Sequence, residues 1–130
     1  MKARPWFVAA LTATLLCAQA LAAGAVERSQ IPDKYKWKTS DLYATEADWT
    51  KAKDDLEARI PKLSEFQGKV GESAQGLLTL LVTGMRVDQD LNQLYTYAMM
   101  RSDEDTRVAR PREMRQTAES LMVKYTAAVA

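Results

Sequence analysis

The sequence contains no histidine and a single cysteine, Cys17. Without histidine, the chain cannot build a histidine general base, a Ser-His or Cys-His nucleophile pair, or a zinc site with a histidine ligand. A single cysteine excludes an internal disulfide, a CxxC redox pair and a cysteine-rich metal site. The sequence therefore predicts no catalytic, cofactor-binding or metal-binding residue within this chain.

The sequence also lacks a surplus of either charge. It has 18 Lys and Arg against 17 Asp and Glu in 130 residues, which gives a formal net charge of +1. No overall electrostatic field selects nucleic acid or an anionic surface, so we expect no nucleic-acid partner. A chain of this length has room for one domain with a moderate core.

The start of the chain has the three parts of a secretory signal peptide. Lys2 and Arg4 precede a short apolar run, and small residues around Ala20-Leu21-Ala22 follow it. A basic start, a short apolar run and an A-x-A site are typical of a segment removed on export. The run is also short for a membrane span. We predict a signal peptide over residues 1–22 and an exported protein, periplasmic or extracellular, with no stable membrane anchor after cleavage.

Residues 23–44 are predicted to form an extended arm, because they show no sustained hydrophobic period. Pro32 argues against a helix around it, and Ile31 is biased toward β or polyproline geometry because it precedes a proline. Four apolar side chains are expected to anchor the arm to a helical body: Tyr35, Trp37, Leu42 and Tyr43.

Residues 45–130 are predicted to form a helical domain whose first helix begins near Thr45. Thr45 and Asp48 have the spacing of a capping box. Pro61 removes a backbone donor, which predicts a kink or break just before it, and Gly68 is expected to end the element. Apolar residues at three- and four-residue spacing predict one buried stripe: Trp49, Ala52, Leu56, Ile60 and Leu63.

A second helix is predicted to begin at Ser73 and to break or bend at Gly84. Asp88 and Asp90 are two positions apart, so they point to different faces and are not expected to form a metal pair. The apolar residues of this helix form a leucine-rich first part and a regular second part: Leu77, Leu78, Leu80, Leu81, then Val87, Leu91, Leu94 and Ala98. Such a broad apolar surface predicts a helix that is contacted on more than one side.

An acidic connector, Asp103-Glu104-Asp105, follows the aromatic end of the second helix. It does not match a calcium loop of the EF-hand type, which needs ligands spread over twelve residues, a central glycine and a final glutamate. We therefore predict a local role, in which Asp105 or Thr106 caps a third helix with Pro111 near its start.

The third helix is predicted to bury one stripe and to expose an arginine cluster. The stripe consists of Met114, Ala118, Leu121, Tyr125 and Ala128. The cluster consists of Arg107, Arg110, Arg112 and Arg115, and we expect surface ion pairing rather than anion binding, because no glycine-rich cradle accompanies it. The apolar pattern reaches Ala130 without a stop signal, as expected of a truncated domain.

In their order and spacing, these features resemble the N-terminal region of the oligoendopeptidase F group, within the thimet-oligopeptidase-like zinc metallopeptidases. The resemblance covers roughly Arg28 to Val129, nearly all of the predicted mature chain. The residues that carry it are Ile31-Pro32, Tyr35-Lys36-Trp37, Leu42-Tyr43, Trp49, Leu63, Phe66, Gly68, Leu77-Leu78, Leu91, Leu94-Tyr95, Tyr97-Ala98, Asp103 and Asp105-Thr106.

The resemblance implies a secreted or periplasmic zinc metallopeptidase that holds oligopeptides in a deep channel of a mostly helical protein. In that family an H-E-x-x-H helix supplies two zinc ligands and a glutamate general base, and a later carboxylate completes the site. None of these residues can be assigned here, because the chain has no histidine. Zinc is thus implied only for the full-length family member. The chain is implied to be its N-terminal, all-α, non-catalytic domain, which forms one wall of the channel and is inactive alone.

Two other interpretations stay open. One is a free-standing exported helical module that binds peptides or acts like a chaperone. A finished module would satisfy its apolar stripes internally, whereas the leucine and methionine surplus of the second helix would leave an exposed patch. The other is a membrane-anchored spacer that retains its first helix, which an uncleaved N-terminus would favour.

Overall fold

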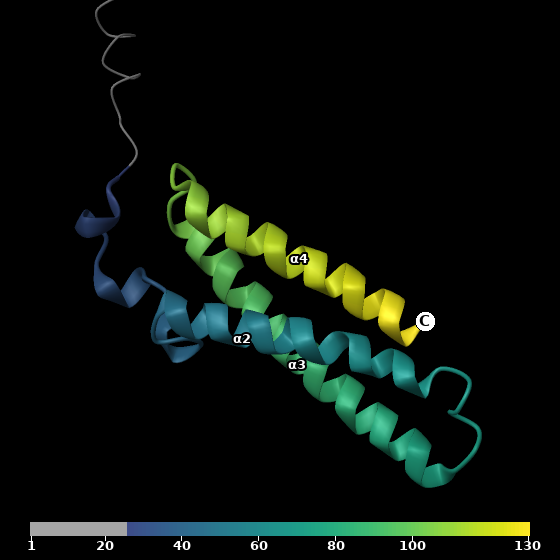
Figure 1. The fold of residues 1–130 in the computed structure, drawn as a ribbon. Helices are drawn as coiled ribbons and strands as arrows, with labels where there is room; N and C mark the ends of the chain where they lie inside the picture. The colour runs from purple at the N-terminus through teal and green to yellow at the C-terminus, as the bar shows by residue number, and fades with distance from the viewer. Residues whose placement is uncertain (1–25) are drawn as a thin grey trace, which may run out of the picture. The chain divides into compact units, whose positions relative to one another are not determined.

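The computed structural model describes residues 26–130, so the predicted signal peptide and Cys17 lie outside the described residues. This part of the chain contains helices and no strand, which confirms the predicted all-α fold (Figure 1). None of its helices is both long and apolar enough to cross a membrane. The elements are η1 (Arg28–Gln30), η2 (Asp33–Tyr35), η3 (Thr39–Asp41), α2 (Glu46–Arg59), η4 (Ile60–Phe66), α3 (Ala74–Glu104) and α4 (Ala109–Val129).

The chain divides into two compact units, with the boundary between Lys36 and Trp37. In the first unit, the 3-10 turns η1 and η2 are joined by extended backbone. Ile31 has φ −80° and ψ 126°, which confirms the conformation expected of a residue before proline. The Lys36 ammonium donates to the Asp33 carboxylate at 2.8 Å and closes the second turn.

The predicted anchoring side chains behave differently from one another. Leu42 and Tyr43 pack against the core, and the Tyr43 ring meets the Tyr97 ring edge-on with 5.4 Å between centroids. Gln93 also donates to the Leu42 carbonyl at 2.9 Å. The prediction was wrong for Trp37, which is 49% exposed, whereas Tyr35 lies in the first unit and its anchoring role stays a prediction. Trp37 precedes η3, the turn that contacts α3.

Helix α2 begins and ends where the sequence predicted. The Asp48 amide donates to the Thr45 hydroxyl at 3.2 Å, and the Thr45 amide donates to the Asp48 carboxylate at 3.0 Å, which completes the capping box. The α-helix ends at Arg59, and the chain continues as the 3-10 helix η4 with Pro61 in its first turn. Gly68 follows with φ 74°, the left-handed geometry predicted for it.

Helix α3 is a single uninterrupted element, so it does not break at Gly84, and a bend there stays a prediction. The Ser73 hydroxyl accepts from the Gly76 amide at 3.0 Å and caps its start, as expected. Gly84 is buried within the helix, and the Tyr125 hydroxyl of α4 donates to its carbonyl at 3.3 Å. A glycine costs a helix interior only about 1 kcal/mol relative to alanine, which is too little by itself to interrupt a long helix.

The connector between α3 and α4 is shorter than predicted, because Asp103 and Glu104 belong to the last turn of α3. The predicted side-chain cap was also wrong. Val108 is the N-cap of α4 and makes no side-chain cap hydrogen bond. Asp105 instead accepts from the backbone amide of Arg107 at 3.0 Å. Pro111 is the third residue of α4, where its missing donor costs little, as predicted.

The core lies where α2, η4 and α4 pack on α3 (Figure 1). The Trp49 indole of α2 donates to the Leu94 carbonyl of α3 at 2.9 Å inside this core. The predicted stripes supply most of the buried side chains, and Ala52 and Tyr125 are partly buried. The buried apolar residues are Trp49, Leu56, Ile60, Leu63, Val87, Leu91, Leu94, Tyr97, Ala98, Met114, Ala118, Leu121 and Ala128.

We expect Thr45→Ala to lower the free energy of unfolding by about 1 kcal/mol, because it removes the hydroxyl that accepts from the Asp48 amide. Thr50→Ala is the matched control, since Thr50 lies inside the same helix and its hydroxyl bonds only to the carbonyl of Glu46. Urea unfolding of both variants measures the difference. Equal stability of the two variants would contradict the role of the capping box.

We expect Gly84→Ala to raise the free energy of unfolding by about 0.5–1 kcal/mol, because alanine favours a continuous helix. A Cβ at this position would meet the Tyr125 hydroxyl oxygen at 3.8 Å, an ordinary contact. Gly68→Ala should have the opposite sign and cost roughly 1–2 kcal/mol, because Gly68 has φ 74°. Thermal and urea unfolding test both; a destabilising Gly84→Ala would show that the added methyl group does not fit beside Tyr125.

Candidate functional site

The described residues offer no metal centre. Residues 26–130 contain no group of three or more His, Cys, Asp or Glu side chains placed to hold a metal ion. Asp88 accepts from the Asn92 amide at 3.2 Å, and Asp90 accepts from Arg59 at 2.7 Å. The two carboxylates thus face different neighbours, as their spacing predicted.

Within the acidic connector, the Asp105 carboxylate pairs with Arg107. The guanidinium of Arg107 donates to the Asp105 carboxylate through two nitrogens, at 2.8 and 2.7 Å, beside the backbone bond already described. These side-chain bonds, and then the backbone bond, lower the pKa of Asp105 from 3.8 to about 2. Asp105 therefore stays ionised at neutral pH and fixes the turn between α3 and α4.

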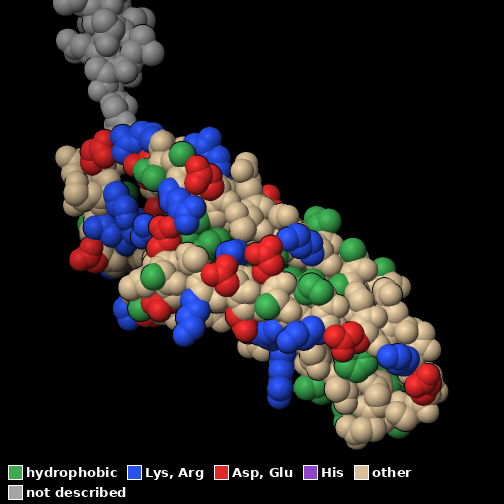
Figure 2. All heavy atoms as spheres, viewed as in Figure 1, with side chains coloured by type: hydrophobic (Ala, Val, Ile, Leu, Met, Phe, Trp, Pro, Cys, Tyr) green, Lys and Arg blue, Asp and Glu red, His purple; other side chains and the backbone are tan. Residues whose placement is uncertain are grey.

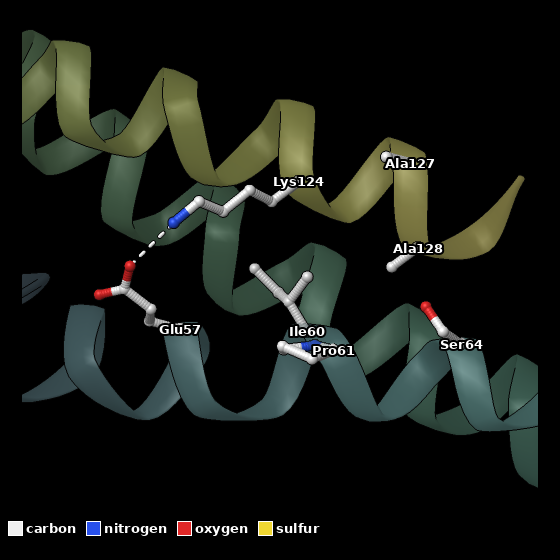
Figure 3. A pocket seen from close by; sticks show the side chains of 7 residues that line it. All are labelled: Glu57, Ile60, Pro61, Ser64, Lys124, Ala127 and Ala128. Atoms are coloured by element: carbon white, nitrogen blue, oxygen red, sulfur yellow. Dashed lines mark hydrogen bonds and ion pairs between the residues drawn. The ribbon is translucent and has the colours of Figure 1, made fainter.

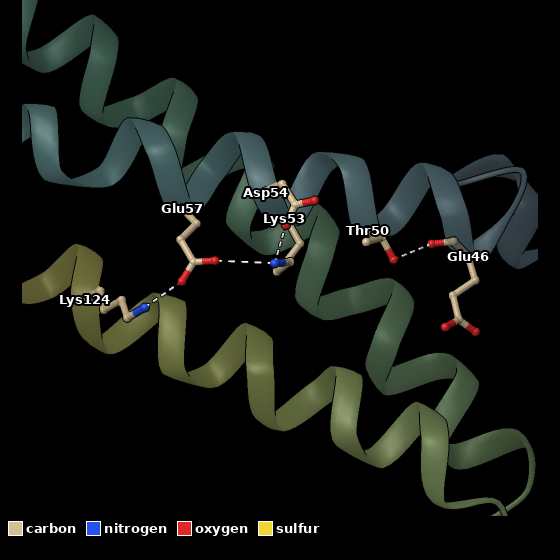
Figure 4. A network of polar contacts seen from close by, with 6 residues as sticks. All are labelled: Glu46, Thr50, Lys53, Asp54, Glu57 and Lys124. Carbon is tan, nitrogen blue, oxygen red and sulfur yellow. Dashed lines mark hydrogen bonds and ion pairs between the residues drawn. The ribbon is translucent and has the colours of Figure 1, made fainter.

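A polar network joins α2 to α4 on the surface (Figure 4). The Glu57 carboxylate accepts from Lys124 of α4 at 2.8 Å and from Lys53 of its own helix at 3.4 Å. Lys53 also pairs with Asp54. The hydrogen bond from Lys124, followed by that from Lys53, lowers the pKa of Glu57. The Glu57 carboxylate therefore stays ionised between two ammonium groups. It links α2 to α4 through an ion pair and does not act as a proton donor.

A second ion pair between α2 and α4 lies nearer the start of α4, within the predicted arginine cluster. Arg110 pairs with Glu46 of α2 at 2.6 Å and with Glu113 at 3.6 Å. Arg115 lies 3.7 Å from Glu119. The prediction of surface ion pairing is confirmed, and the partners of these two arginines lie on α2 and α4. Exposed pairs of this kind contribute about 0–1 kcal/mol each, so they orient the helices more than they stabilise them.

An open groove runs between η4 and the end of α4 (Figure 3). It has a volume of about 510 Å³ and a mostly apolar floor. The Glu57–Lys124 pair closes one end, and Ser64 and Ala128 face each other toward the other end. The groove exists because Pro61 ends α2 and because α4 carries only alanine at 127 and 128. Its polar groups are the Glu57–Lys124 ion pair and the Ser64 hydroxyl.

The most distinctive surface is the side of the first half of α3 that faces away from the core. We call it the outer α3 face. Its five side chains are 38–71% exposed, which confirms the exposed patch predicted from the leucine and methionine surplus. They are Leu77, Leu78, Leu81, Val82 and Met85.

The charged side chains form no field of one sign. In the view of Figure 2, lysine and arginine side chains (blue) are interspersed with aspartate and glutamate side chains (red) over the helices. This distribution matches the near-zero net charge of the sequence. The outer α3 face is therefore the feature that distinguishes this surface, and its position on α3 could not be read from the hydrophobic pattern alone.

Comparison with known proteins supplies relatives for this helical unit. The chain is 31% identical over 102 residues to the plasmid-encoded oligoendopeptidase F of Lactococcus lactis subsp. cremoris, covering 78% of this chain and 17% of that protein. It is 31% identical over 99 residues to the group B oligopeptidase PepB of Streptococcus agalactiae, covering 76% of this chain and 16% of that protein. Oligopeptidase PepF of Bacillus subtilis is 36% identical over 80 residues, which is 62% of this chain and 12% of that protein.

These matches define the class of the chain as a peptidase-related helical region. More specifically, it is an oligoendopeptidase F-like segment, which confirms the resemblance predicted from the sequence. The chain spans 12–17% of the length of these relatives. No family model matches the chain, and no solved structure matches it.

The Asp105 turn predicts a specific pH dependence. The folded pKa of about 2 lies below the ordinary value of 3.8, so the stabilisation is present above pH 3.8 and is lost as the pH falls toward 2. We expect Arg107→Ala to move the pKa of Asp105 back toward 3.8, as measured by carboxyl carbon NMR titration. Arg112→Ala is the control. Arg112 is a nearby cation that donates to the Thr106 carbonyl, so its removal should leave the pKa of Asp105 unchanged. An equal shift in both variants would indicate a general charge effect.

Proposed function

We propose that this chain is the N-terminal, non-catalytic part of an exported zinc-dependent oligoendopeptidase that cleaves short peptides. One observation carries the proposal: 78% of this chain matches an oligoendopeptidase F, of which it spans only 17%. The activity, the zinc ligands and the general base then belong to residues outside this chain. The proposed substrates are oligopeptides.

The proposed role of the segment is to form one wall of the substrate channel. Its three long helices share one buried core, which holds their relative positions, and two surface ion pairs link α2 to α4. The ionised Glu57 and Asp105 carboxylates are engaged by cationic side chains, so they position helices and a turn. A rigid wall of this kind admits short peptides and excludes folded proteins.

The proposed location of the enzyme is the periplasm or the outside of the cell. This part of the proposal is supported by the basic start, short apolar run and A-x-A site at the beginning of the sequence. A free-standing exported peptide-binding or chaperone-like module is the alternative. It is less favoured, because the outer α3 face leaves apolar side chains exposed that a finished module would bury.

Isolation of the native product from the exported fraction tests the proposal directly. We expect an intact mass well above that of this 14.5 kDa chain, and peptide mapping beyond Ala130 that reaches an H-E-x-x-H sequence. Oligopeptide cleavage by this product should be lost on addition of a chelator and restored by zinc, because the zinc ion would activate the attacking water.

The 130-residue chain produced alone is the control for this experiment and should cleave no oligopeptide, because it has no histidine. A native product that ends at Ala130 would contradict the proposal and favour the free-standing module. Peptide binding by that product would then be measured by calorimetry.

A further inference from the structure

We propose that the outer α3 face is the surface on which the rest of the same polypeptide packs, and that its occupant is an apolar helix of that catalytic part. This inference rests on the proposed function, because it needs a longer polypeptide. It goes further by naming the residues of this segment that make the contact.

The spacing of the outer α3 face is that of a helix-packing surface. Leu77, Leu81 and Met85 follow one another at four-residue intervals, and Leu78 and Val82 form a second row beside them. Rows of this spacing are the ridges that fit into the grooves of a facing helix. The core-facing side of the same stretch is already covered, because Gly84 and Val87 are buried and Leu80 packs against the core. The first half of α3 is thus apolar on two sides and covered on one.

The outer α3 face has a polar border. Asp88, one turn beyond Met85, accepts at 3.2 Å from the side-chain amide of Asn92, which lies one turn further along α3. A hollow of about 420 Å³ between the apolar and polar residues is lined by Val82, Met85, Arg86, Asp88 and Gln89. An apolar centre with a polar rim is the usual composition of a protein contact surface.

The size of the face favours a linked occupant over a second copy of this chain. Nine residues from Leu77 to Met85 span only about 13 Å of helix, whereas a stable dimer buries about 800 Å² on each partner. A segment joined through the same chain packs at an effective concentration in the millimolar range, so a small contact suffices. The relatives supply the length required, because this chain spans only 12–17% of them.

Cysteine labelling tests which surface the rest of the polypeptide covers. Leu78→Cys places a thiol on the outer α3 face, and Ala58→Cys places one on the exposed side of α2 as a matched control. Each variant is made in the exported product and in the 130-residue chain carrying Cys17→Ala, and the reaction of the introduced thiol with a maleimide is timed by peptide mapping. Circular dichroism checks that both variants keep their helices.

We expect the thiol of Leu78→Cys to react at least about tenfold more slowly in the exported product than in the 130-residue chain, because packing buries it. Ala58→Cys should react at the same rate in both. Equal rates for Leu78→Cys, or slowing at both positions, would overturn the proposed contact. Slow reaction of Leu78→Cys in the 130-residue chain that is relieved by dilution would assign the face to a second copy and would also overturn it.

Failure of the proposed function is recognised separately. The intact mass and the chelator-sensitive cleavage report on the peptidase, whereas the labelling ratio reports on the contact alone. A long, active product with a fast-reacting Leu78→Cys overturns the contact and leaves the proposed function standing. A product that ends at Ala130 overturns both, and its mass shows this before any labelling is done.

Discussion

The fold of the Trp37–Ala130 unit depends on one inner stripe of α3, formed by Val87, Leu91, Leu94 and Ala98. All four side chains are buried, and α2, η4 and α4 all pack on the helix that carries them. The Trp49 indole bonds to the Leu94 carbonyl at 2.9 Å, which fixes α2 against this stripe with a directional contact. A buried indole N–H without a partner would be costly, so this hydrogen bond defines how the two helices meet.

The polar groups of this unit hold the helices in place. Glu57 and Glu46 of α2 reach Lys124 and Arg110 of α4, while Asp105 is engaged by Arg107 in the following turn. Each of these carboxylates faces a cation, and the pKa values of Glu57 and Asp105 are lowered as a result. The chain that carries these pairs is similar to a part that makes up 16–17% of two oligopeptidases.

Helix α3 has two apolar sides, of which one is buried and the other is exposed. Its inner side organises the core, whereas its outer side from Leu77 to Met85 is exposed and bordered by the Asp88–Asn92 hydrogen bond. An exposed apolar face is unfavourable in water unless another surface covers it. The same feature therefore bears on both proposals, because it favours a segment of a larger protein and indicates where the rest would pack.

The sequence by itself determined the features that depend on near neighbours: the capping box at Thr45, the end of α2 before Pro61, the left-handed Gly68 and the three buried stripes. These depend on contacts within about four residues, which local spacing encodes. Only the tertiary structure decided that α3 continues through Gly84 and which leucines stay exposed. Those outcomes depend on partners far apart in sequence, such as Trp49 and Leu94, which are 45 residues apart. A helical pattern shows which residues can be buried together, but the packing of distant helices selects the side of α3 that is covered.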